Sequence, residues 1–280
     1  MVTHKSGAHA VVQTLKYLSL IIAVFVILFP PYIIIVNSFK TKEEFLANPT
    51  LSLPNNFLNF SNFIEAFKQA DMGLAFGNTL IIIALTLVLN IFLGSAFCYA
   101  VGRFEFRGKG LLVGLFLFAT IIPQITTQVV NFKTIQGIGL TNNLMGPVLL
   151  YIGADIMQIY IYLQFIRNIP GELDESAMLE GASLFRIYRS IIFPLLAPAT
   201  ATIIILKTIA IYNDMFTPYL YLPRQEHVVV STSLMRFFGV NSGDWQMVSS
   251  AIMIIMIPTA ILYLFLQRYI FAGVTSGAVK

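Results

Sequence analysis

Six long apolar segments, separated by polar connections, set the narrowest limit on how this chain folds. A bilayer core takes roughly 20 apolar residues as helix. Charged residues make up only 11% of the chain, against about 25% in soluble domains, so much of it must lie where charge is not tolerated. We therefore predict an all-α membrane protein whose single domain, 1–280, has six transmembrane helices, at about 15–36, 75–101, 110–131, 144–166, 191–211 and 247–268.

The first of these segments is predicted to be a retained helix rather than a cleaved signal peptide. The hydrophobic region of a signal peptide takes roughly 7–15 residues and is followed by a small-residue cleavage site. Segment 15–36 is longer, and it continues into an Asn-Ser-Phe-Lys sequence at 37–40. We therefore expect it to stay in the membrane.

Basic residues are concentrated in one set of connections, and this predicts the orientation of the chain. Cytoplasmic loops of membrane proteins carry an excess of Lys and Arg. The basic residues of the termini and of the 102–109 and 167–190 loops are Lys5, Lys16, Arg103, Arg107, Lys109, Arg167, Arg186, Arg189, Arg268 and Lys280. Both termini and the 167–190 loop are therefore predicted to be cytoplasmic. The same bias explains the net charge of +4 better than nucleic-acid binding does, because the basic residues form no patch.

The 167–190 loop has the pattern of two short helices joined at a bend. Glu172, Asp174 and Glu175 complement the positive end of a helix dipole. Gly181 can supply the turn that ends this helix, and Ser183 can cap the next one. Such a pair can fit a groove on a partner protein and move as a rigid body. A hairpin lying on anionic lipid is the alternative, but lipid phosphates would repel the acidic residues of the loop.

Residues 175–194 resemble the EAA loop of bacterial ABC importer permeases. That pattern is Glu-Ala-Ala, three residues, Gly, nine residues and then Ile-x-Leu-Pro. The matching positions in this chain are Glu175, Ala177, Gly181, Ile191 and Pro194. Ser176 replaces the second motif residue and Phe193 replaces the leucine.

Most of the remaining chain is similar to the sugar-importer branch of these permeases. The most specific sign is the carboxyl-terminal sequence Gly-x-Thr-x-Gly-x-x-Lys at 273–280. Further similar stretches are 37–40, 76–79, 100–104, 212–214 and 267–269. The resemblance implies a type I (MetI-like) importer bundle in a bacterial cytoplasmic membrane, with a cytoplasmic coupling helix.

The resemblance also implies the partners. They are a second permease subunit, a dimer of cytoplasmic ATPase subunits that binds ATP and Mg, an extracellular solute-binding protein, and a sugar substrate. This chain would bind no cofactor and perform no covalent chemistry, so it would not be an enzyme. The absence of a phosphate-binding Gly-x-x-x-x-Gly-Lys-Ser/Thr sequence agrees with a separate ATPase chain.

Two further segments acquire expected contacts from the resemblance. The tail 271–280, too polar and glycine-rich for a long packed helix, would enter the interface between the ATPase subunits. Segment 222–243 would face the binding protein. The residues expected to couple the loop to the ATPase are Glu175, Ser176, Ala177, Glu180, Gly181, Ala182 and Arg186.

Asp155 lies near the centre of the fourth apolar segment, with Gln158 three residues further on. A central Asp costs roughly 2.5–3.5 kcal/mol on the insertion scale, so it is expected to face a bundle interior or water. A carboxylate beside an amide matches the donors and acceptors of a sugar. A hydrogen bond that only holds helices together is the competing interpretation. For Lys207 in the fifth segment, we expect the side chain to extend to the membrane interface.

Other polar residues extend the predicted translocation pathway. Its members are Gln124, Gln128, Asp155, Gln158 and Asn213. The histidines have no spacing that suggests a metal site. Two other functions stay open at this point: an ABC permease for a non-sugar solute, and an ion-coupled secondary transporter that uses Asp155. The second would require internal repeats or paired intramembrane carboxylates, which the sequence does not show.

Overall fold

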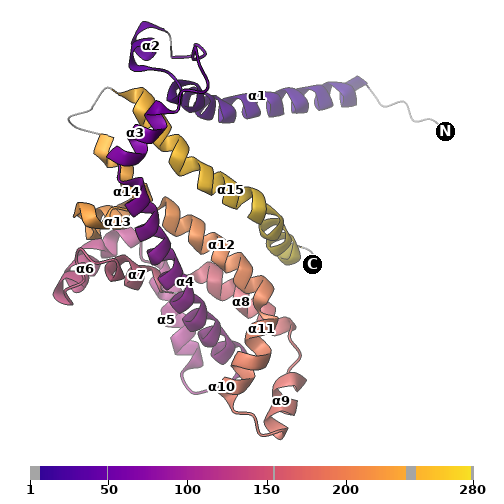
Figure 1. The fold of residues 1–280 in the computed structure, drawn as a ribbon. Coiled ribbons are helices and arrows are strands. Elements are labelled where there is room, and N and C mark those ends of the chain that lie inside the picture. The colour runs from indigo at the N-terminus through magenta and orange to yellow at the C-terminus, as the bar shows by residue number, and fades with distance from the viewer. Residues whose placement is uncertain (1–6, 49, 154, 238–243, 279–280) are drawn as a thin grey trace. The chain divides into compact units, whose positions relative to one another are not determined.

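The computed structural model describes residues 7–48, 50–153, 155–237 and 244–278. This described part of the chain is helical and contains no strand (Figure 1). It divides into two compact units, Met1–Ala70 with Leu234–Pro258 and Asp71–Ser233 with Thr259–Lys280. That the chain is a single membrane domain stays a prediction.

The first unit contains the long amino-terminal helix and several short ones. Helix α1 is apolar from Val12 onward, and most of its large side chains up to Phe29 are exposed, as expected of a helix whose solvent is lipid. The bounds of the elements are α1 Gly7–Ser38, α2 Lys42–Ala47, α3 Ser61–Gln69, the short 3-10 helix η3 Leu234–Phe237 and the first part of α15, Trp245–Ala278.

The Asn-Ser-Phe-Lys sequence at 37–40 lies at the centre of this unit. The Asn37 side chain donates to the carbonyl oxygens of Ile33 and Thr50, at 2.8 and 3.0 Å. Lys40 is fully buried, and its ammonium group lies 3.4 Å from the Thr50 carbonyl oxygen. Phe39 packs against three further rings, Phe57, Phe60 and Phe63. The family-like sequence therefore forms the packing centre of the unit.

Helix α4 (Met72–Arg103) is the axis of the second unit and packs mainly against α8 (Ile156–Asn168) and α12 (Ala197–Asn213) (Figure 1). A methyl group at Gly94 would lie 2.3 Å from the Gln158 amide nitrogen, so a larger residue there would displace the Gln158 side chain that packs between α4 and α8. The remaining elements are α5 Lys109–Ile121, α6 Gln124–Gly137, α7 Met145–Tyr151, α9 Glu172–Leu179, α10 Leu184–Ile187, the π-helix η1 Tyr188–Ile192, α11 Phe193–Leu195, α13 Phe216–Tyr221, the 3-10 helix η2 Gln225–His227 and α14 Val230–Ser233.

Three helices of the described chain are long and apolar enough to cross a membrane: Val12–Ser38, Met72–Arg103 and Trp245–Phe265. They correspond to the first, second and sixth predicted segments. The number of spans rises to as many as five if each of two bent helix pairs is counted as one span. Six transmembrane helices therefore stay a prediction, whereas the all-α class is confirmed.

The three middle segments are broken rather than continuous helices. Segment 144–166 is broken between Tyr151 and Ile156, with a bend of 53°. The fifth segment joins a helix pair that bends by 74° near Leu196. Segment 110–131 is interrupted at Pro123, because proline lacks an amide donor and keeps the preceding residue extended. Helix α15 continues through the tail to Ala278, past the predicted end of the sixth segment, and Lys280 lies outside the described residues.

Candidate functional site

Helices α9 and α10 form the two-helix element predicted for the 167–190 loop. Gly181 has a φ of +81°, a left-handed conformation that glycine adopts without strain. Its amide donates to the Met178 carbonyl and the Ala182 amide donates to the Ala177 carbonyl, both at 2.9 Å. This pair of bonds is the Schellman motif that ends helices. The Ser183 hydroxyl then caps α10 by accepting from the Arg186 amide, as predicted.

The element presents a surface that is both charged and apolar. Of the seven predicted coupling residues, those with exposed side chains or backbone are Glu175, Ser176, Glu180, Gly181 and Arg186, whereas Ala177 is buried and Ala182 is half-buried at the bend. Leu179 at the end of α9 is 91% exposed, and Leu184 and Phe185 of α10 are also exposed. The sequence prediction included none of these three apolar side chains, which lie between the motif positions.

Asp174 anchors this element to the end of α4. Its carboxylate is buried, accepts a hydrogen bond of 2.6 Å from the Tyr99 hydroxyl, and pairs with the Arg103 guanidinium at 3.2 Å. Arg103 also donates to the carbonyl oxygen of Ile169, the residue that ends α8, at 2.7 Å. The sequence pattern indicated only a helix-dipole role for Asp174. The signal it missed is the i, i+3 spacing to the buried motif residue Ala177.

A π-helix connects the element to the fifth segment. Its first residue, Tyr188, is buried, and its hydroxyl lies 2.7 Å from the Ser95 hydroxyl of α4. Its ring also packs against Phe92 and Tyr99. The α9–α10 element is therefore joined to α4 at two places, through Asp174 and through Tyr188.

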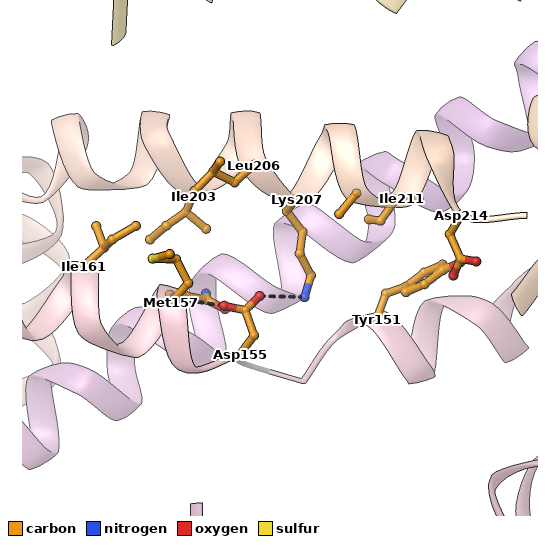
Figure 2. Close-up of a pocket in the computed structure, with 11 residues that line it drawn as sticks. Tyr151, Asp155, Met157, Ile161, Ile203, Leu206, Lys207, Ile211 and Asp214 are labelled. Atoms are coloured by element: carbon orange, nitrogen blue, oxygen red, sulfur yellow. Dashed lines mark hydrogen bonds and ion pairs between the residues drawn. The ribbon is translucent and has the colours of Figure 1, made fainter. Parts of the chain in front are cut away.

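A cavity of about 490 Å³ lies between α8 and α12 (Figure 2). Its lining residues are Tyr151, Asp155, Met157, Gln158, Ile161, Ile203, Leu206, Lys207, Ala210, Ile211 and Asp214. Figure 2 shows Lys207 extending from α12 toward Asp155, with Tyr151 and Asp214 on one side and Ile161 and Ile203 on the other. The cavity is therefore polar at one end and apolar at the other.

The sequence led us to expect Asp155 inside a helix. In the structure it instead caps the first turn of α8. Its Oδ1 accepts from the Gln158 amide at 2.8 Å and its Oδ2 lies 3.4 Å from the Lys207 ammonium group. The Lys207 side chain is only 13% exposed. The expectation that Lys207 extends to the membrane interface is therefore wrong, because the side chain has an ion partner within its own unit.

The break before α8 leaves carbonyl groups that other helices satisfy. The Asn90 side chain, fully buried in α4, donates to the carbonyl oxygens of Ile152 and Gly153 at 2.8 and 3.1 Å. Lys207 also reaches the Gly153 carbonyl, at 3.3 Å. Backbone groups at membrane depth need such internal partners, so two other helices, α4 and α12, stabilise this irregular segment.

The structure brings together two of the five predicted pathway residues. Asp155 and Gln158 line the cavity, and the buried Gln158 amide also donates to the Asn90 carbonyl at 3.1 Å. Asn213 and Gln128 do not line it: Asn213 donates to the Ile209 carbonyl, and Gln128 is half-buried in α6. The Gln124 side chain lies outside the described residues. Three polar lining residues were missed, Tyr151, Lys207 and Asp214, because separate helices supply them. Among the described residues, no group of three or more His, Cys, Asp and Glu residues could hold a metal ion.

No protein-family model matches this chain. It is, however, 33% identical over 253 residues to the melibiose/raffinose/stachyose import permease protein MelC of Bacillus subtilis, a match that covers 90% of this chain and 91% of that protein. The chain belongs to the ABC sugar importer permeases. The permease is also 33% identical over 254 residues to AmyC of Thermoanaerobacterium thermosulfurigenes, described as a probable permease for starch degradation products, with 90% and 91% of the two chains covered.

A solved structure shows the same fold. A chain of a bacterial ABC transporter involved in the import of the acidic polysaccharide alginate superposes with a TM-score of 0.85 at 20% identity, and the match covers 96% of the permease and 99% of that chain. Family membership confirms a multi-pass membrane transport subunit that is not itself an enzyme, since ATP is hydrolysed by a separate ATPase in these importers. It also removes the ion-coupled alternative.

Proposed function

We propose that this permease is one of two permease subunits of an ATP-driven oligosaccharide importer, with six transmembrane helices and both termini in the cytoplasm. The curated relatives support the cargo class, since their names specify raffinose, stachyose and starch products. The proposed partners are a second permease, a dimer of ATPase subunits that binds ATP and Mg, and an extracellular sugar-binding protein. The two permeases would each form half of the translocation pathway.

The observation that carries the coupling role is the attachment of the exposed α9–α10 element to the spans behind it. Its outer surface combines the EAA-like residues with the apolar side chains of Leu179, Leu184 and Phe185. Its inner surface is held by Asp174 to Tyr99 and Arg103 of α4. A partner protein can bind such a surface. The inner contacts of the element with α4 can then transmit a displacement of α9 and α10 to that helix.

The mechanism follows from these contacts. Closure of the ATPase dimer on ATP would displace α9 and α10 together, because the Schellman turn at Gly181 fixes one to the other. Asp174 and Arg103 would carry the displacement into α4, and the π-helix would carry it into α12. The helices that line the cavity would then move relative to one another, opening the pathway to one side of the membrane and afterwards to the other.

Copurification followed by ATPase measurement tests the proposal. The permease should copurify with a second permease and an ATPase, and the ATPase activity of the complex in lipid should rise when a sugar-loaded binding protein is added. A panel of neutral oligosaccharides would identify the cargo class. A permease that purifies alone and transports sugar on an ion gradient would overturn the proposal.

A further inference from the structure

The break between α7 and α8 has the construction of a binding site. It lies within the fourth predicted span, and the carbonyl groups of residues 152 and 153 are satisfied by Asn90 from α4 and Lys207 from α12. Irregular backbone at membrane depth is tolerated where it is buried in protein or lines a water-filled cavity. Tyr151 and Asp155, which flank this break, line the 490 Å³ cavity, whose volume is within the range of roughly 300–1,000 Å³ typical of small-molecule sites.

The polar groups of the cavity are mostly acceptors. The Asp155 side chain is 52% exposed, whereas its partner Lys207 is 13% exposed and is engaged by the Gly153 carbonyl as well. At the other end, Asp214 accepts from the Tyr151 hydroxyl at 2.7 Å and from the Thr217 amide at 3.1 Å. Two carboxylates and one ammonium group give the lining a formal charge of −1, and the ammonium group is the less accessible of the pair formed with Asp155.

A further acceptor lies in the wall of the cavity. Gln158 is 2% exposed, and its Oε1 atom has no hydrogen-bond partner among the described residues. The opposite end of the cavity is apolar, formed by Ile161, Ile203 and Leu206. A hydroxyl-rich ring with apolar C–H faces matches both ends, because its hydroxyl groups can donate to the acceptors while its faces lie against the aliphatic side chains.

We propose that this cavity is a sugar-contact site of this subunit that takes neutral oligosaccharides and rejects sugars carrying carboxylates, because Asp155 and Asp214 repel a second negative charge. The proposal rests on the proposed function and adds the location and the charge selection. A carboxylate in the cavity would lie close to two like charges, within the Debye length of roughly 8 Å, so salt would screen the repulsion only in part. A neutral sugar carries no such penalty.

Protection of a cysteine in the cavity tests this directly and does not depend on the selectivity of the binding protein. Leu206→Cys places a thiol in the lining, and Cys98→Ala removes the one native cysteine. The copurified complex in lipid vesicles is alkylated with a small maleimide in the presence of raffinose, maltotriose or trigalacturonate. At least one neutral trisaccharide should slow alkylation threefold or more, and trigalacturonate should leave the rate unchanged.

A charge variant then separates charge selection from fit. Asp155→Asn keeps a good helix cap and removes one negative charge, so trigalacturonate should now protect the thiol at least threefold. Asp71→Asn is the matched control, since Asp71 is also an acidic residue in the N-cap position of a helix, α4, and does not line the cavity. It should leave the pattern of protection unchanged. Asp214→Asn gives a second route to the same charge if Asp155→Asn fails to assemble.

The outcomes are distinguishable. The inference alone would be overturned if neutral and acidic trisaccharides protected the Leu206→Cys thiol equally in the parent complex. It would also be overturned if neither protected the thiol in vesicles that do import neutral sugar. Vesicles that contain the assembled complex and import no carbohydrate would overturn the proposed function.

Discussion

The Tyr99 hydroxyl lies 2.6 Å from Oδ1 of Asp174, so the last turns of α4 are bonded to the first turn of α9. The two residues are separated by 75 positions in the chain. The contact is buried and is reinforced by Arg103 on the other carboxylate oxygen. This joins the element proposed to meet the ATPase to the central helix of the second unit.

Removing this contact should uncouple the importer. Tyr99→Phe leaves a buried carboxylate oxygen without its donor, at a cost of about 1–3 kcal/mol. We expect the complex to assemble and hydrolyse ATP, while the number of sugars imported per ATP falls at least fivefold. Asp174→Asn should have the same effect. Glu172→Gln removes an exposed charge from the same helix and serves as the control; unchanged import in Tyr99→Phe would contradict the anchor.

The turn at Gly181 should tolerate residues in the order of their left-handed propensity. A Cβ at this position meets no atom within 4 Å, so only the φ of +81° opposes substitution. Gly181→Asn should retain most of the import activity and Gly181→Ala less, since a left-handed alanine costs roughly 1–2 kcal/mol. Gly181→Val should be the most impaired, because β-branched residues are true outliers at positive φ. Initial rates of sugar uptake test this order, and equal rates would show that the bend does not matter.

The Asp155–Lys207 pair should show energetic coupling in a double-mutant cycle. Lys207→Met removes a donor from the Gly153 carbonyl and leaves Asp155 without its ion partner. The free energy of unfolding of the purified permease should therefore fall by about 1–3 kcal/mol. Adding Asp155→Asn should recover part of this loss. We expect a coupling energy of at least 0.5 kcal/mol, as found for residues in direct contact. Strictly additive effects would mean that the pair contributes nothing beyond its members.

Lys40 should make the stability of the first unit depend on alkaline pH. Burial lowers the pKa of this lysine below 10.5, and the charge of Glu44 offsets only part of the effect. Between the lowered pKa and 10.5, the unfolded chain binds more protons than the folded one, so stability rises with pH in this window. Below the lowered pKa, the full cost of the buried charge is present. Thermal unfolding from pH 7 to pH 10.5 should show this rise, and Lys40→Met should abolish it; the same slope in both proteins would contradict it.

The sequence predicted the helical segments and the local geometry of α9 and α10, since both depend on neighbouring residues. Apolar length marked the spans, and Gly181 and Ser183 marked the turn and the cap. The break before α8 was missed, because a hydropathy window averages over Gly153 and Asp155, and because the groups that stabilise the break, Asn90 and Lys207, come from helices far away in the chain.

The cavity was only half predicted for the same reason. Asp155 and Gln158 were identified because charge and amide groups are rare inside apolar segments. Lys207 was assigned to the interface since its distance from the segment end was the only information available. Its actual position depends on the approach of α12 to α8, which tertiary packing determines and which no local sequence pattern reveals.

The most direct test of the account is sugar uptake by vesicles that contain the complete complex and a sugar-loaded binding protein. The account predicts uptake of a neutral oligosaccharide only when ATP and Mg are supplied on the side of the α9–α10 element, with no effect of ionophores. Uptake that proceeds without ATP and stops when ionophores collapse the ion gradients would contradict it.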